Sequence, residues 1–454
     1  MRLEKPKNEN YCATIVVLDN FVSIPKADKI KSALIFGNNV IVSKEAKAGD
    51  IGVFFPAECQ LEHEFVSANN LYRKSEFGNV DPLQKGYFEK HCRIKCAKFL
   101  GVKSEGLWVP ISSFDYLNSF YGSYSEGPVS AQLVPWVGKS FDKIGTHEIC
   151  RKYVPKSTNV GPQNKAKVAK LADSIVDNQW RFHFDTENLR KNIHKISPFD
   201  IISISDKEHG TSAIIGKPLV IRKLTWYERL LKKIGVRIQE HIYGLTYSSR
   251  KVIKAVDGVD KSNGLHFYTE DIWGIVAKEI SDKIPNSFLL YGEIVGYTPT
   301  GRAIQSASGG RAYHYGCAVG EHRFAIYRVV TTNNEGLTLE LSWPQMKEFC
   351  TKYGLEMVKE LYYGPVSTLV PYDSSMDIRD WQENLLKTLG TLYVHDQDCV
   401  YNKGLPAEGI VIRVDHLNEC SSYKLKNFRF LMDESVLLDA GVADMETAES
   451  EEVV

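Results

Sequence analysis

The sequence predicts an α+β protein with a β-rich N-terminal domain followed by a larger domain of mixed sheets and helices. Two observations support this prediction. Short apolar runs broken by glycine and other turn residues fill positions 1–145, which is typical of a small β-barrel or sandwich. Between 185 and 432, apolar strand-like runs alternate with segments of helical periodicity. At 454 residues the chain has room for two or three domains.

The first domain is expected to contain strands at 12–18, 39–43, 51–55, 93–100 and 107–111. Gly49, Gly101 and Gly106 separate these apolar runs. A linker with a helix is predicted at 146–184, because Val168 and Leu171 recur at helical spacing within 164–180.

Two helices are predicted in the second domain, and both are expected to cover its core. The segment 271–283 repeats apolar residues at helical spacing. The other helix begins at Ser342 and has Pro344 in its first turn. The last 22 residues, 433–454, hold eight acidic side chains and no basic one, which predicts a solvated, disordered tail.

Composition and charge narrow the functional classes. With 43% apolar residues and 56 basic against 56 acidic side chains, the composition is that of a globular protein and excludes a fibrous one. A net charge of zero does not exclude nucleic acid, since binding needs only a local basic face. The nine cysteines are scattered, without a Cys-x-x-Cys pair, which argues against a disulfide scaffold and a structural zinc. Without an apolar leader or membrane-spanning stretch, a cytoplasmic or nucleoplasmic location and no membrane partner are expected.

Lys207 is the first candidate for chemistry. It follows a strand-like stretch at 199–204 and precedes Gly210 by three positions. A lysine amine can attack a nucleotide α-phosphate and form a phosphoramidate, provided that nearby positive charge or a metal leaves it unprotonated. Because Lys-x-x-Gly is short and often occurs by chance, the interpretation depends on the residues downstream.

Polar residues at the ends of three apolar strands supply that context. Glu293 stands within an apolar run bracketed by glycines, and Glu408 precedes another. Lys424 and Lys426 alternate along a third run, so they are expected on the same side of a strand. Taken singly, the two acids could be salt-bridge partners, and the two lysines could lie on an exposed strand face. In combination with Lys207, however, two acids and a lysine pair favour nucleotidyl transfer, which needs metal-holding carboxylates and cations at the α-phosphate.

These segments resemble the ordered motifs of the covalent nucleotidyltransferase superfamily, which contains the ATP-dependent polynucleotide ligases and the messenger-RNA capping enzymes. The matching motifs are Lys207-Glu208-His209-Gly210, Leu290-Tyr291-Gly292-Glu293, Glu408-Gly409-Ile410-Val411 and Tyr423-Lys424-Leu425-Lys426. Two further segments resemble motifs that contact the nucleotide, and they are Ser248-Ser249-Arg250 and Arg323-Phe324-Ala325-Ile326-Tyr327.

The resemblance implies a role for each residue. Lys207 would accept AMP from ATP, with Glu408, Lys424 and Lys426 as the other catalytic residues. Glu293 and Glu408 would hold Mg²⁺ or Mn²⁺ through water. The residues implied in nucleotide binding are Asp206, Gly210, Arg250 near the ribose or incoming strand, Glu293 at the ribose hydroxyls, Tyr327 stacked on adenine, and Lys424 and Lys426 at the α-phosphate.

Domain order points to a subgroup within the superfamily. The β-rich module comes first, and it is similar to the N-terminal OB domain of the Deinococcus-type, OB-first RNA ligases. That resemblance implies an OB-like nucleic-acid-binding domain at 1–145 and a nucleotidyltransferase domain at 185–432.

The implied function is ATP-dependent joining of a 3′-hydroxyl RNA end to a 5′-phosphate end through lysyl-AMP and an adenylylated 5′ end, in nick sealing or RNA repair. RNA or a nicked duplex with RNA on the 3′-hydroxyl side would be the partner of a monomer. The alternatives are a GTP-dependent capping guanylyltransferase, a non-catalytic RNA-binding protein on the same fold, and a DNA ligase.

The segment 222–254 is a candidate RNA-contacting surface. It holds nine Lys or Arg against two Glu, with tyrosines and a tryptophan interleaved. Basic side chains neutralise phosphates and aromatic rings stack on bases. The alternative is a solvated helix face with a few packed aromatics.

Overall fold

The computed structural model describes residues 2–123, 126–155, 171–183, 185–257, 268, 270–416 and 420–442. These residues form two compact units. Unit 1 comprises Met1–Tyr153 with Arg190–Ile193, and unit 2 comprises Val154–Leu189 with His194–Val454. In the described part of the chain, no helix combines the length and the apolar character needed to cross a membrane.

Unit 1 is built mainly of short strands. Its strands make a four-stranded sheet β10-β1-β5-β9, a three-stranded sheet β2-β3-β4, and the pairs β6-β13, β7-β8 and β11-β12. The strands are β1 (Ala13–Val17), β2 (Phe21–Val22), β3 (Ile30–Ile35), β4 (Asn38–Ser43), β5 (Ile51–Pro56), β6 (Cys59–Leu61), β7 (Ala97–Phe99), β8 (Val102–Ser104), β9 (Gly106–Pro110), β10 (Ser140–Phe141), β11 (Lys143–Ile144), β12 (His147–Glu148) and β13 (Cys150–Lys152). The helices are α1 (His63–Ala68), α2 (Asn118–Tyr121) and α3 (Val129–Leu133), with single turns η1 (Ser75–Phe77), η2 (Ile111–Leu117) and η3 (Val134–Trp136).

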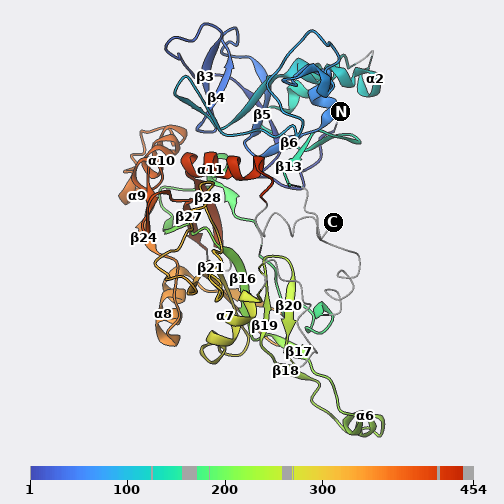
Figure 1. Ribbon diagram of the computed structural model, residues 1–454, viewed down its shortest axis with the longest axis vertical. Coiled ribbons are helices and arrows are strands. Elements are labelled where there is room, and N and C mark those ends of the chain that lie inside the picture. Colours follow the sequence, from blue (N-terminus) through green and yellow to red (C-terminus); the bar gives the residue numbers. More distant parts are fainter. Residues whose placement is uncertain are drawn as a thin grey trace. The chain divides into compact units, whose positions relative to one another are not determined.

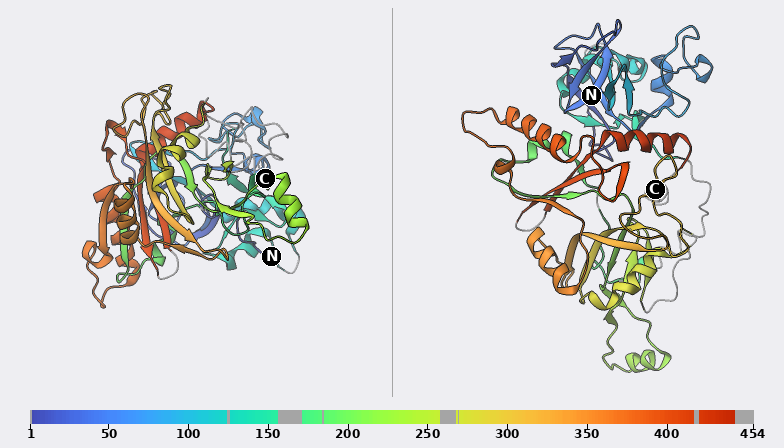
Figure 2. Two further views of the ribbon diagram at one scale, coloured as in Figure 1. Left: turned by 90° about the horizontal axis from the view of Figure 1, so that it is seen from below. Right: turned by 60° about the vertical axis from the view of Figure 1, so that its left-hand side comes forward.

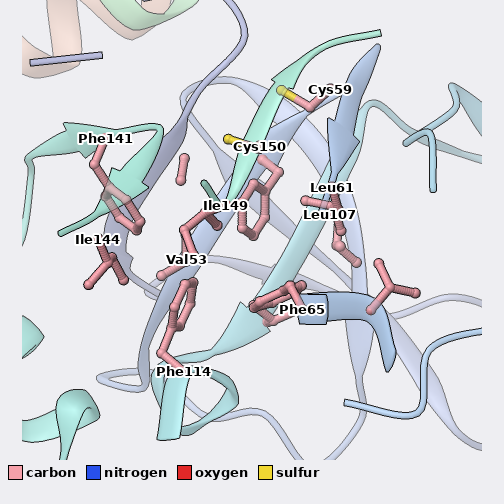
Figure 3. Close-up of a cluster of buried hydrophobic side chains, with 14 of the residues drawn as sticks. Val53, Cys59, Leu61, Phe65, Leu107, Phe114, Phe141, Ile144, Ile149 and Cys150 are labelled. Atoms are coloured by element: carbon pink, nitrogen blue, oxygen red, sulfur yellow. The ribbon is translucent and has the colours of Figure 1, made fainter. Parts of the chain in front are cut away.

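The continuous apolar sequence of β5 reflects burial of this strand on both of its faces. Val53 and Phe55 point into the larger core, whereas Phe54 points into a smaller cluster on the opposite face. Side chains alternate across a strand, so β5 is buried on both faces. Figure 3 shows the larger core, in which Phe65, Phe114 and Phe141 surround Val53.

The predicted β-rich character of unit 1 agrees with these strands, but the OB barrel does not follow from them. Its described strands form sheets of two to four strands, without a closed barrel. The predicted strand at 93–100 is wrong in length. Arg93 makes only an isolated bridge with Gln60, and β7 begins at Ala97. Strand β7 ends at Phe99, because Leu100 and Gly101 take positive φ and turn the chain back into a hairpin with β8.

The boundary of unit 1 also lies beyond the predicted residue 145. Strand β13 pairs antiparallel with β6, with Cys150 opposite Leu61, so the chain returns to unit 1 until Tyr153.

Unit 2 contains two larger sheets, a five-stranded sheet β14-β28-β27-β15-β24 and a six-stranded sheet β20-β19-β16-β21-β22-β23. Their pairings are antiparallel except that of β14 with β28, which agrees with the predicted mixed sheets. The strands are β14 (Glu187–Asn188), β15 (Ile201–Asp206), β16 (Thr211–Gly216), β17 (Leu219–Ile221), β18 (His241–Tyr243), β19 (Thr246–Ser248), β20 (Ile253–Val256), β21 (Phe288–Gly296), β22 (His322–Thr332), β23 (Thr338–Glu340), β24 (Glu360–Pro365), β25 (Asp398–Cys399), β26 (Asn402–Pro406), β27 (Gly409–Asp415) and β28 (Cys420–Lys426). The helices and turns are α6 (Trp226–Lys233), α7 (Ile272–Ile280), η5 (Ser281–Lys283), α8 (Trp343–Tyr353), α9 (Val366–Leu369), α10 (Ile378–Tyr393) and α11 (Phe428–Asp439). Helix α5 (Leu189–Asn192) and turn η4 (Ile193–Lys195) contain Arg190–Ile193, which belongs to unit 1.

Both predicted helices of unit 2 are present beside the six-stranded sheet (Figures 1 and 2). Asp271 caps the start of α7 by accepting a hydrogen bond from the Gly274 amide. Ser342 and Gln345 form a capping box at the start of α8. Both helices contribute buried side chains to the core on that sheet, as the prediction required.

Two other predictions need revision. The disordered tail was placed from Asp433, but α11 runs to Asp439, because Asn427 caps its start and Phe428 and Phe430 bury in unit 2. Residues 443–454 lie outside the described part of the chain. So do residues 164–170 of the predicted connecting helix. The prediction is wrong for 173–180, because the helix ends at 172 and Ile175 instead bridges to Val220, packing with Leu171 into a small core of unit 2.

Candidate active site

Lys207 lies in a loop that joins the two large sheets of unit 2. Strand β15 of the five-stranded sheet ends at Asp206, and β16 of the six-stranded sheet begins at Thr211. The backbone amide of Lys207 donates a hydrogen bond to the carbonyl of Gly409, at 2.9 Å. The loop 207–210 is thereby attached to the start of β27, the strand that Glu408 precedes.

Glu408 contacts the side chain of Lys207. The Lys207 Nζ lies 2.8 Å from Glu408 Oε1, and the carboxylate side chain is 5% exposed. The Nζ of Lys426 lies 3.7 Å from the same oxygen. The other oxygen, Oε2, is buried and lies 3.8 Å from His209 Nδ1, but it makes no hydrogen bond to any described residue. A buried carboxylate with one oxygen still to be satisfied suits a cation or its bound water.

The two lysines of β28 add positive charge beside Lys207. Tyr423 and Leu425 are buried on one face of β28. Because side chains alternate along a strand, Lys424 and Lys426 lie on the opposite face. Burial lowers the pKa of Lys424 to about 8, and the charges of Lys426, Lys207 and Arg250 act in the same direction. A surplus of cations in a half-buried site favours a phosphate group.

Gly210 and Glu293 connect the other end of the loop to the six-stranded sheet. The Gly210 amide donates to Glu293 Oε1 at 3.2 Å. A Cβ at position 210 would lie 2.2 Å from the carbonyl oxygen of Ile294, so only glycine fits this close approach. Glu293 and Glu408 therefore hold opposite ends of the loop that carries Lys207.

The carboxylates fit a metal that keeps its water ligands. In the described ranges, no group of three or more His, Cys, Asp or Glu side chains is arranged to ligate a metal ion. Mg²⁺ commonly keeps several waters and uses only one or two carboxylates. The chain thus offers Glu293 and Glu408 for a hydrated divalent cation, with the buried Oε2 of Glu408 as the strongest indication.

Tyr327 and Arg250 each contact residues outside the group formed by Lys207, Glu408 and the two lysines of β28. The Tyr327 hydroxyl is 3.3 Å from Ser212 Oγ, and Ser212 pairs with Glu293 across β16 and β21. The His183 ring lies 5.4 Å from the Tyr327 ring at 35°. Arg250 forms an ion pair with Asp185.

Asp206 and Glu208 do not join the lysine cluster. The pKa of Asp206 is raised by burial, against the charges of Lys359 and Arg323. Glu208 forms an ion pair with Arg323 at 2.7 Å, and burial raises its pKa to about 7. The charge of Arg323 acts on both Asp206 and Glu208, as expected for side chains that point to the same side of an extended chain.

Sequence reasoning missed three residues at this site. Glu434 lies 3.1 Å from the Lys426 Nζ, and the same Nζ lies over the Phe430 ring at 5.4 Å. Asn427 followed by apolar residues was the available signal for the helix that carries both. The Tyr315 hydroxyl accepts a hydrogen bond from the His209 amide at 2.6 Å, and no motif indicated it.

The comparisons with known proteins agree with this geometry. Residues 204–427 match the family model described as RNA ligase, a range that runs from the end of β15 to the cap of α11 and contains Lys207, Glu293, Glu408 and both lysines of β28. No curated protein matches the chain significantly.

Solved structures of Naegleria gruberi RNA ligase share the fold. A variant with AMP and Mn has a TM-score of 0.53 and 15% identity, covering 92% of this chain and 97% of that chain. A variant with ATP and Mn has a TM-score of 0.54 and 14% identity, covering 93% and 99%. The ligase with PPi has a TM-score of 0.51 and 14% identity, covering 94% and 98%. The RNA ligase family match agrees with the predicted enzyme class over residues 204–427, and the solved structures show that the chain shares the fold of the Naegleria gruberi ligase.

Proposed function

We propose that the chain is an ATP-dependent RNA ligase that joins a 3′-hydroxyl RNA end to a 5′-phosphate end. The observation that carries the proposal is the position of the Lys207 amine, 2.8 Å from the buried Glu408 and beside the Lys424 and Lys426 pair. The Naegleria gruberi ligases described with AMP, ATP and Mn support ATP as the nucleotide and Mg²⁺ or Mn²⁺ as the metal.

In the first step, the unprotonated amine of Lys207 attacks the α-phosphorus of ATP. An N–P bond forms, the bond between the α-phosphorus and the bridging oxygen breaks, pyrophosphate leaves, and the nitrogen releases one proton to water. The positive charges of Lys424 and Lys426 offset the negative charge that builds on the α-phosphate. The reaction is an in-line displacement, so the site mainly aligns reactants and neutralises charge.

The remaining residues have binding roles in this proposal. Glu293 holds the ribose hydroxyls and, with Glu408, the water ligands of the metal. Tyr327 stacks on adenine, a use that suits a flat ring with a polar tip. Arg250 lies at the ribose or the incoming strand. The divalent cation supplies further neutralisation of phosphate charge when bound.

Two later displacements complete the reaction. AMP passes from Lys207 to the 5′-phosphate end, and the 3′-hydroxyl then displaces AMP to form the phosphodiester. The order of the units, with the β-rich unit first, supports assignment to the OB-first group that seals nicks with RNA on the 3′-hydroxyl side. The β-rich unit would then be the OB-like nucleic-acid-binding domain.

Transfer of label from nucleotide to protein tests the proposal. We expect α-labelled ATP, and not α-labelled GTP, to label the wild-type chain and a Lys352→Ala control on α8. Lys207→Ala should abolish labelling, and Lys207→Arg should too, because a guanidinium is no nucleophile at neutral pH.

Other outcomes identify the alternatives. Labelling by GTP would indicate a capping guanylyltransferase, and no labelling at all would indicate a non-catalytic RNA-binding protein. Nicked duplexes with RNA or DNA on the 3′-hydroxyl side separate an RNA ligase from a DNA ligase.

A further inference from the structure

An arm extends from unit 2 between β16 and β19. It comprises residues 219–243, in which β17 pairs antiparallel with β18 and α6 lies between them. Figures 1 and 2 show the arm reaching away from the six-stranded sheet, with α6 at its end. Thr225 and Glu228 form a capping box at the start of α6. None of the residues of α6 is buried, so the helix forms without packing into the core of unit 2.

The arm is a cationic element. Residues 219–243 contain six Lys or Arg and two Glu, a formal charge of +4. Both carboxylates form ion pairs within the arm, Arg222 with Glu228 at 2.6 Å and Lys232 with Glu240 at 2.5 Å. Arg229, Lys233 and Arg237 are further cations of the arm, and all three are exposed. The acidic side chains of the arm are thus used to fix its shape, and a surplus of positive charge faces outward.

The arm also exposes its rings. Trp226 is 78% exposed and Tyr227 is more than half exposed, with ring centroids 6.2 Å apart. Large aromatic side chains contribute much to stability when buried, so exposure of two neighbouring rings on a helix that lacks a core indicates a binding surface. Leu230 and the 71% exposed Ile234 continue the surface along α6.

The remainder of the basic segment 222–254, beyond the arm, does not expose its charged and aromatic side chains in this way. Tyr247 on β19 is buried and donates a hydrogen bond to Asp271 at 2.7 Å. Lys254 on β20 is buried with its Nζ 4.9 Å from the Trp273 ring centroid. The candidate surface is therefore the arm alone, and not the whole of 222–254.

We propose that the arm is an RNA-binding element that holds the substrate during sealing, while nucleotide chemistry occurs at Lys207. The identity of the substrate rests on the proposed function. A net positive charge beside exposed rings matches the two features of a nucleic-acid strand, its phosphates and its bases. A lipid surface fits less well, because α6 has only eight residues, about 12 Å of helix, and offers a short apolar stripe.

Two arm variants test the proposal, Lys233→Ala with Arg237→Ala and Trp226→Ala with Tyr227→Ala. Lys352→Ala with Lys387→Ala, on α8 and α10, removes the same charge elsewhere on unit 2 and serves as the control. The probe is a labelled nicked duplex with RNA on the 3′-hydroxyl side, titrated at several salt concentrations. Circular dichroism and label transfer from ATP confirm that each variant is folded and can form the protein adenylate.

We expect each arm variant to bind the duplex about tenfold more weakly than the wild type, with unchanged label transfer. In the charge variant, the slope of log K against log salt should fall by about 2, since each phosphate contact contributes about 0.9. The control should match the wild type in both measurements.

Unchanged affinity and salt dependence in both arm variants would overturn the proposal. So would arm-dependent binding to vesicles of phosphatidylserine and phosphatidylcholine with unchanged affinity for the duplex. A wild-type chain that binds the duplex through the arm but takes no label from ATP would contradict the proposed function and leave the arm's role standing.

Discussion

Replacing Glu408 with glutamine tests whether this carboxylate acts in catalysis or only as an ion-pair partner. The substitution keeps the shape of the side chain and removes a charge 2.8 Å from Lys207 and 3.7 Å from Lys426. At an effective dielectric of about 20, the two gross attractions are about 6 and about 4.5 kcal/mol. Desolvation of the carboxylate offsets most of this sum, and removing one partner of a buried pair costs about 3–5 kcal/mol.

We expect the lower end of that range, about 3 kcal/mol. The Lys207 side chain is 26% exposed and can turn to water, and Lys426 keeps Glu434 at 3.1 Å. With a urea m-value of about 2–3 kcal/mol/M, the midpoint for unit 2 should fall by about 1 M. Glu434→Gln is the matched control, because it removes a more exposed partner of Lys426 and should cost under about 1 kcal/mol.

The rate of label transfer from ATP separates the two roles. If Glu408 holds the water ligands of the metal, Glu408→Gln should slow the first step at least about 100-fold, equivalent to about 2.7 kcal/mol. A folded Glu408→Gln protein that still labels at the wild-type rate would refute the catalytic role. An unchanged urea midpoint would contradict the expected loss of about 3 kcal/mol in the free energy of unfolding.

Three further substitutions have defined outcomes. Gly210→Ala should cost about 1–3 kcal/mol and slow labelling, because its Cβ would meet the Ile294 carbonyl at 2.2 Å; urea denaturation at wild-type stability would contradict this. Tyr327→Leu should raise the KM for ATP up to about tenfold with little change in kcat, as measured in steady-state adenylylation, and an unchanged KM would exclude stacking. The raised pKa of Glu208 means that the folded state binds its proton more tightly than the unfolded state, so the contribution of Glu208 to stability should fall by about 3 kcal/mol as pH rises from 4.5 to 7. Glu208→Gln should flatten that fall in urea midpoints measured across this range, and an equally steep fall in the variant would assign it to other groups.

The order of motifs predicted the residues around Lys207 better than it predicted the architecture of unit 1. Polar residues at the ends of apolar strands are informative because burial there requires a partner, and Lys207 and Lys426 do lie around one carboxylate oxygen of Glu408. The alternation of Lys424 and Lys426 with buried Tyr423 and Leu425 follows directly from strand geometry.

The features that the sequence did not predict depend on tertiary contacts, which leave no local signal in the sequence. Strand β5 is buried on both faces, so its apolar run does not indicate whether its sheet closes into a barrel. Acidic composition made 433–439 look disordered, whereas Phe428 and Phe430 anchor α11 and bring Glu434 to Lys426. Asp206 and Glu208 flank Lys207 in sequence, yet they face Arg323, which lies more than 100 residues away in the chain.

The position of the covalent nucleotide tests the central claim most directly. The wild-type chain is incubated with ATP and a divalent metal, digested, and mapped by mass spectrometry for the peptide that carries AMP. We predict AMP on Lys207 alone, linked to its Nζ. AMP on Lys424 or Lys426, or a chain that carries no covalent AMP, would contradict the assignment of Lys207 as the nucleophile.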